Sequence, residues 1–151
     1  MAKYLAARET VTPVAGNMVL GFTTGLQEIC KVTEIRIGGS AASSTKNLFA
    51  MRRSTSNLTT PTAQTPAKKS PTSPAAYTDV ATTATGEPTT AAAPAIWSEA
   101  MDMHGNVVHW VAMTEADVLL VLGATAGNNE MTLESTTGTG AGTIEVVFEE
   151  V

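Results

Sequence analysis

In this chain of 151 residues, the candidate bases for a catalytic triad are the two histidines, His104 and His109. A catalytic triad needs a nucleophile beside its base, and neither histidine has a motif such as G-x-S-x-G nearby. His109 stands in the apolar VVHWV, which favours a packed or hydrogen-bonded strand residue, whereas His104 stands in DMHGN, which favours an exposed hairpin turn. The sequence therefore predicts no enzyme active site.

Metal and phosphate sites are also not expected. Two histidines and one cysteine fall short of a structural zinc set. Asp102, Glu115 and Asp117 flank one predicted hairpin and could gather calcium, but they lack the alternating acidic positions and the glycine of a calcium loop. The glycine-rich TGTGAGT at 137–143 precedes a strand and not a helix, which favours a flexible turn over a phosphate loop. We expect neither a metal nor a cofactor.

The sequence carries few features that indicate the cellular compartment of the protein. A lone cysteine cannot form an intrachain disulfide, so Cys30 is predicted to be a small buried hydrophobe in a strand. The N-terminal MAKYLAARETVTP lacks the continuous apolar core of a signal peptide. No run reaches the roughly 18 apolar residues of a membrane helix. These features favour a soluble protein made in a reducing cytoplasm, with no membrane partner.

Charge is distributed unevenly along the chain. All nine Lys and Arg lie in the first 70 residues beside only three acids, and the other eleven acids follow without a Lys or Arg. Segregated halves would make a bipolar molecule suited to head-to-tail stacking. Interleaved strands, the usual arrangement in antiparallel folds, would instead pair the charges across a sheet, and we expect this second arrangement.

Two adjacent basic pairs could form an interface: Arg52 with Arg53, and Lys68 with Lys69. Because the isoelectric point is about 4.9 and aromatic residues do not interleave with these charges, we do not expect a nucleic-acid partner. Ordinary solvation and contact with an acidic protein partner remain open for these four residues.

Eight segments have the apolar or alternating pattern of strands and are bounded by turn residues: 18–23, 28–39, 46–54, 95–101, 106–113, 117–123, 129–135 and 142–151. Residues 54–95 hold six of the seven prolines among Thr, Ser and Ala, which predicts a long loop over the sheet or a disordered linker. Residues 1–17 are expected to form an extended N-terminal arm, and deleting residues 1–12 is expected to leave the β fold intact.

The resulting prediction is an all-β protein. It is an antiparallel β-sandwich, jelly-roll-like, with about eight strands in a single domain over 18–151 that includes the long loop 54–95. Lys3, Tyr4, Leu5 and Arg8 of the arm are the candidate contacts to a partner.

The sequence resembles the small jelly-roll head decoration or cement proteins of tailed bacteriophages. The resemblance covers residue 20 to the end. It rests on KVTEIRIGGSAASSTKNLFAMRRSTS, TPTAQTPAKKSPTSPAA, TGEPTTAAAPAIWSEAMDMHGNVVHWVAM and GTGAGTIEVVFEE, and above all on Glu87-Pro88-Thr89, the run from Trp110 to Ala112 and the terminal VVFEE. MTEAD at 113–117 departs from the family pattern, which has a Pro-Gly-like turn there.

This resemblance implies a non-enzymatic virion protein. It would assemble as a homotrimer on the outside of an icosahedral capsid and bridge neighbouring major capsid subunits, with the N-terminal arm as the shell contact. A carbohydrate- or receptor-binding β-sandwich of a phage fibre or adhesin is the rival, because jelly rolls also host lectins. Trp97 and Trp110 are the large aromatic platforms such a site would use.

Overall fold

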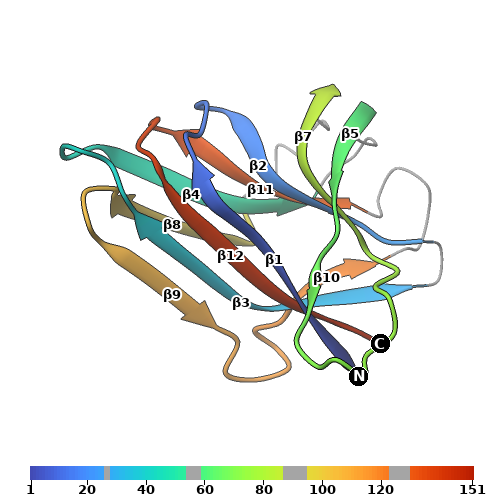
Figure 1. The fold of residues 1–151 in the computed structure, drawn as a ribbon. Helices are drawn as coiled ribbons and strands as arrows, with labels where there is room; N and C mark the ends of the chain where they lie inside the picture. The colour runs from blue at the N-terminus through green and yellow to red at the C-terminus, as the bar shows by residue number, and fades with distance from the viewer. Residues whose placement is uncertain (26–27, 54–58, 87–94, 123–129) are drawn as a thin grey trace.

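The fold is a two-layered β-sandwich (Figure 1). The computed structural model describes residues 1–25, 28–53, 59–86, 95–122 and 130–151, and these contain strands and no helix. The strands are β1 (Ala2–Val11), β2 (Asn17–Thr23), β3 (Ile29–Gly39), β4 (Lys46–Arg53), β5 (Thr59–Gln64), β6 (Ala67–Lys68), β7 (Asp79–Gly86), β8 (Trp97–Asp102), β9 (Val107–Val111), β10 (Leu119–Leu122), β11 (Glu130–Thr137) and β12 (Gly142–Glu150).

Each sheet has six described strands, all paired antiparallel. The first has the order β10-β3-β12-β1-β6, with β9 also paired to β3, and the second has the order β5-β7-β2-β11-β4-β8. β9 and β10 pair with successive parts of one edge of β3, because β12 occupies the other edge. The prediction of an all-β antiparallel sandwich is confirmed.

The chain crosses between the sheets in the manner of a jelly roll. β1, β3 and β12 lie in the first sheet, and β2, β4 and β11 lie in the second. β12 pairs with both β1 and β3, while β11 pairs with both β2 and β4. Each of the eight predicted strands corresponds to an observed one, namely β2, β3, β4, β8, β9, β10, β11 and β12.

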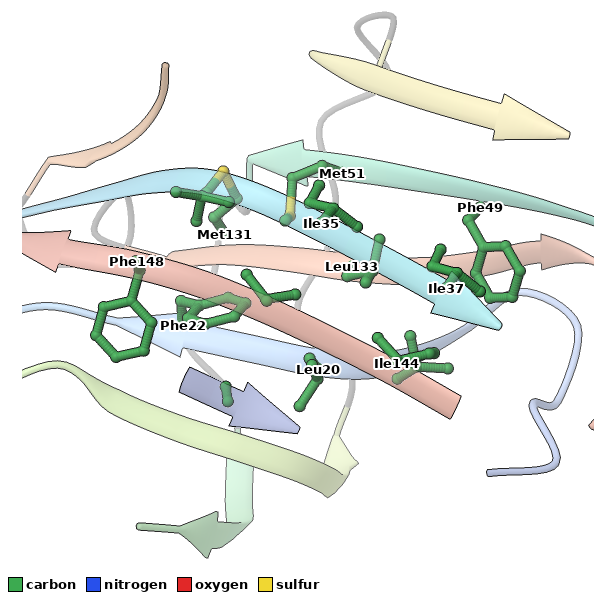
Figure 2. Packing of buried hydrophobic residues seen from close by; sticks show 14 of the residues in the cluster. Leu20, Phe22, Ile35, Ile37, Phe49, Met51, Met131, Leu133, Ile144 and Phe148 are labelled. Carbon is green, nitrogen blue, oxygen red and sulfur yellow. The ribbon is translucent and has the colours of Figure 1, made fainter. Parts of the chain in front are cut away.

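The core lies between the two sheets (Figure 2). Alternation puts Ile35 and Ile37 of β3 inside, with no exposed surface, while Arg36 between them is exposed. A register shift opposite Val147 and Phe148 of β12 inserts one extra residue into β3, so that Cys30 and Val32 also point inward. The inner face of β12 supplies Ile144, Val146 and Phe148, and β2, β4 and β11 supply Leu20, Phe22, Phe49, Met51, Met131 and Leu133 from the other sheet.

The predicted N-terminal arm is wrong. Residues 2–11 form β1, which pairs with β12 along most of its length, from Ala2 opposite Glu150 to Val11 opposite Gly142. Tyr4 and Ala6 have no exposed surface. The segment folds into the sheet because its alternate residues are apolar enough to cover the core while Lys3 faces outward.

The long loop predicted for 54–95 is also corrected. It contains β5, β6 and β7, and these extend the edges of both sheets. β7 pairs with β2 and buries Val80 and Ala81, so this Thr- and Ala-rich segment adds to the core. Pro61 is tolerated because β5 is an edge strand, where an amide proton is not always needed. Residues 54–58 and 87–94, including Glu87-Pro88-Thr89, lie outside the described residues.

The glycine-rich turn between β11 and β12 is held by a buried asparagine. Asn47 accepts a hydrogen bond from the Gly140 amide at 3.0 Å and donates one to the Gly140 carbonyl at 3.2 Å. Gly138 has a φ of +84°, and a Cβ there would lie 2.2 Å from the carbonyl oxygen of Lys46. The turn predicted to be flexible is therefore closely packed against the start of β4.

Replacing Gly138 by Ala should destabilise the protein more than the same change at Gly16. Both glycines have a φ of +84°, but a Cβ at Gly16 meets nothing within 4 Å. Gly16→Ala should therefore lose only the cost of the left-handed backbone, about 1–2 kcal/mol, and Gly138→Ala at least twice that. Urea denaturation measures both. Equal losses would mean that the contact with Lys46 relaxes at no cost.

Candidate interaction surfaces

The four residues proposed as partner contacts point to opposite sides of β1. Tyr4 stacks on Phe148 with ring centroids 5.4 Å apart, and its hydroxyl donates to the Pro74 carbonyl at 3.2 Å. Burial, followed by the charge of Glu150, raises the pKa of Tyr4. A side chain with no exposed surface cannot contact a partner in this fold, so Tyr4 is corrected to a core residue.

Arg8 also has an internal role. Its guanidinium donates to the carbonyls of Val19 and Thr82, each at 3.2 Å, and so ties β1 to two strands of the other sheet. Partial burial lowers its pKa. Lys3 and Leu5 lie on the outer face, and they are the two of the four proposed contacts that a partner could reach directly.

The two basic pairs lie in different sheets. Arg52 pairs through Nε with Glu134 at 3.3 Å, whereas Arg53 is exposed and has no ion pair to another described residue. Lys68 and Lys69 are exposed at β6, where the Lys69 amide donates to the Lys3 carbonyl at 2.9 Å. The structure therefore does not bring the four predicted interface charges into one patch.

The histidines and the cysteine make structural contacts. His104 is exposed in a turn with Nδ1 2.9 Å from the Ala41 carbonyl, and His109 has Nε2 2.7 Å from Glu34. Both environments match the predictions from the sequence. Cys30 is buried, and burial raises its pKa to about 12, so the thiol is neutral at physiological pH and unsuited to nucleophilic attack.

The three acids considered for calcium have separate partners. Asp102 accepts hydrogen bonds in the turns around it, Glu115 pairs with Lys31 at 3.2 Å, and Asp117 accepts from Thr114. Within the ranges that the structure describes, no three His, Cys, Asp or Glu side chains are placed to hold a metal ion.

The outer face of the first sheet carries cross-strand ion pairs. Lys3 of β1 stands opposite Glu149 of β12 in the register and contacts it at 2.6 Å. Arg36 of β3 stands opposite Glu145 and contacts it at 3.2 Å. Opposite charges in directly paired positions stabilise a sheet modestly. The predicted pairing of basic and acidic parts across the sheet is confirmed at these positions.

An exposed apolar strip runs along the edge strand β9 and just beyond it. It consists of Val107, Val111 and Met113, with exposed fractions of 67%, 43% and 85%, and we call it the β9 strip. Val108 and Trp110, on the other face of β9, are partly buried against the core. The sheet thus covers only one face of the strand, and the apolar side chains of the other face meet solvent.

The two tryptophans meet although they belong to different sheets. Trp97 begins β8 and Trp110 lies in β9, and their ring centroids are 6.4 Å apart with a 54° interplanar angle. Arg53 and Asp117 line the same depression, whose volume is about 400 Å³. Sequence reasoning identified both tryptophans but gave no reason to place them together, because their contact depends on the sandwich closing at β8 and β9.

No known protein-family model matches the chain, no curated protein is detectably similar to it, and no solved structure matches it. Among the described residues there is also no helix with the length and hydrophobicity needed to span a membrane.

Proposed function

We propose that this chain is a structural protein of a tailed-phage virion, a decoration or cement protein that binds the outside of the capsid as a homotrimer and bridges major capsid subunits. The proposal rests on the sequence resemblance described above, in 31–56, 60–76, 85–113 and 138–150, and the observation that supports it is the jelly-roll arrangement of the strands. The structural contacts of Cys30, His104 and His109 support a non-enzymatic role.

The β9 strip is the proposed contact between subunits of the trimer. The strip exposes the apolar side chains of Val107, Val111 and Met113. His109 lies on the same face of β9, and its imidazole contacts Glu34 of the same chain. Covering such a strip by a neighbour removes apolar area from water, which favours association. Lys68 and Lys69 are the proposed contact to acidic capsid surface, because both are exposed and neither has an ion pair to another described residue.

Binding of this protein would stabilise the capsid shell through thermodynamic linkage. A protein that binds the assembled shell and not its free subunits stabilises the shell by its binding free energy. Three linked copies bind with an avidity well above that of one copy, so each contact can be weak.

The test is co-sedimentation of the purified protein with empty shells assembled from the major capsid protein of the phage that carries its gene. We expect a particle of three times 15.6 kDa by light scattering, and saturable binding that weakens as salt rises. Lys68→Glu with Lys69→Glu should abolish binding, while Lys46→Glu, at another exposed lysine, should not. A folded protein that stays in the supernatant at every shell concentration would refute the proposal.

A further inference from the structure

We propose that the depression lined by Trp97 and Trp110 binds an acidic saccharide, that is, a sugar ring that carries a carboxylate. The depression measures about 400 Å³, within the range of small-ligand sites. Its charged lining residues are Arg53, at the end of β4, and Asp117, in the turn before β10. This activity is independent of the proposed capsid role, so either can fail without the other.

The indoles provide the apolar wall. Trp97 is 9% exposed and Trp110 is partly buried against the core, so the backbone and neighbouring side chains hold both rings in place. Trp110 has the larger exposed surface of the two and would make the main contact with a ligand, while Trp97 supplies a smaller part of the lining. Sugars present patches of C–H groups that pack on the electron-rich faces of aromatic rings.

Arg53 and Asp117 supply opposite hydrogen-bonding capacities. Arg53 is exposed and has no ion pair to another described residue, and a guanidinium binds a carboxylate through two parallel hydrogen bonds. Asp117 is fixed by the amide and hydroxyl of Thr114, which donate to its Oδ2 at 3.0 and 2.8 Å. An ionised carboxylate only accepts, so it suits the hydroxyl donors of a sugar.

Other ligand classes fit this set of residues less well. A quaternary ammonium group would suit two indoles and a carboxylate, but Arg53 at the same wall would repel it. A purely apolar ligand would remove water from Arg53 and Asp117 and would offer no hydrogen bonds in its place. An acidic sugar supplies a carboxylate, hydroxyl donors and an apolar face in one molecule.

Another depression, of about 580 Å³, lies over the first sheet and is less suitable. Two of its three lysines, Lys3 and Lys31, already pair with Glu149 and Glu115, at 2.6 and 3.2 Å. The third, Lys69, shares the depression with the carboxylates of Glu34, Glu115 and Glu149, which would repel an acidic ligand.

The chain's own fluorescence reports on this site, because its only two tryptophans both line the depression. We would titrate the full chain with D-glucuronate, with N-acetylneuraminate, and with D-glucose, which matches glucuronate but lacks the carboxylate. At least one acidic sugar should change the tryptophan emission saturably with a Kd of about 1–10 mM, and glucose should bind at least about tenfold more weakly.

Single substitutions test which residues contact the sugar. Arg53→Met should weaken the acidic sugar about tenfold and remove the preference over glucose, and Asp117→Asn should weaken both sugars. Lys46→Met, which removes an exposed cation elsewhere on β4, should bind like the parent protein. Near-ultraviolet circular dichroism checks that each variant is folded. Two results would overturn the proposal: no saturable change with either acidic sugar up to about 50 mM, or equal affinity of the parent for glucuronate and glucose.

Discussion

Removing residues 1–11 should leave a chain that does not form the sandwich at 25 °C. The deletion takes away β1, which pairs with β12 from Ala2 to Val11 and buries Tyr4 and Ala6 completely. Loss of a large buried aromatic alone costs about 3–5 kcal/mol, and a whole strand adds lost backbone pairing, against a total stability of about 5–15 kcal/mol. Far-ultraviolet circular dichroism and limited proteolysis measure the outcome.

The substitution Lys3→Ser is the control for this deletion. Lys3 is on the same strand, but its side chain is 58% exposed and makes a surface ion pair, so its loss should cost no more than about 1 kcal/mol. If the truncated chain kept a strand spectrum and the parent's melting temperature, β1 would be dispensable, as an arm would be.

The substitution Phe148→Ala should destabilise the protein by about 3–5 kcal/mol and lower the melting temperature by roughly 10 °C. Phe148 has no exposed surface. Its ring centroid lies 5.4 Å from that of Tyr4 and 5.7 Å from that of Phe22, so it joins two strands of its own sheet to β2 of the other. Figure 2 shows Phe22 and Phe148 from facing strands, and an alanine would leave a cavity between them.

Val14→Ala provides the matched surface change. Val14 is 61% exposed between β1 and β2, and its truncation should alter stability by no more than about 0.5 kcal/mol. Chemical denaturation of both variants gives the comparison. A loss below about 1 kcal/mol for Phe148→Ala would mean that the core between β12 and β2 closes over the gap.

The strands recognised in the sequence are those with β-branched or aromatic residues between clear turns. The missed strands have weaker patterns: AKYLAARETV of β1 relies on Ala6 between Tyr4 and Arg8, and DVATTATG of β7 relies on Val80 and Ala81. Alanine and threonine contribute little apolar area, so composition suggested a linker or an arm. Pairing with strands distant in sequence, β12 and β2, is what makes these segments strands.

The candidate surfaces were predictable only in part. Basic residues concentrate in the first part of the chain and acidic residues in the second, which predicted ion pairs between strands. Arg36 with Glu145 is such a pair. The Trp97–Trp110 contact was not predictable, because β8 and β9 are consecutive in the chain but lie in different sheets. Local patterns indicate which side of a strand faces inward, but not how the edges of two sheets meet.

The positions of β11 and β12 have a consequence for synthesis. These last two strands fill the centres of the two sheets, each between two strands made much earlier. A nascent chain on the ribosome therefore has the flanks of its future sheets but not the strands that join them, and its basic first part lacks the acids of β12. Such long-range closure is slow and must wait until β11 and β12 have been made, so the earlier strands are exposed to aggregation until then.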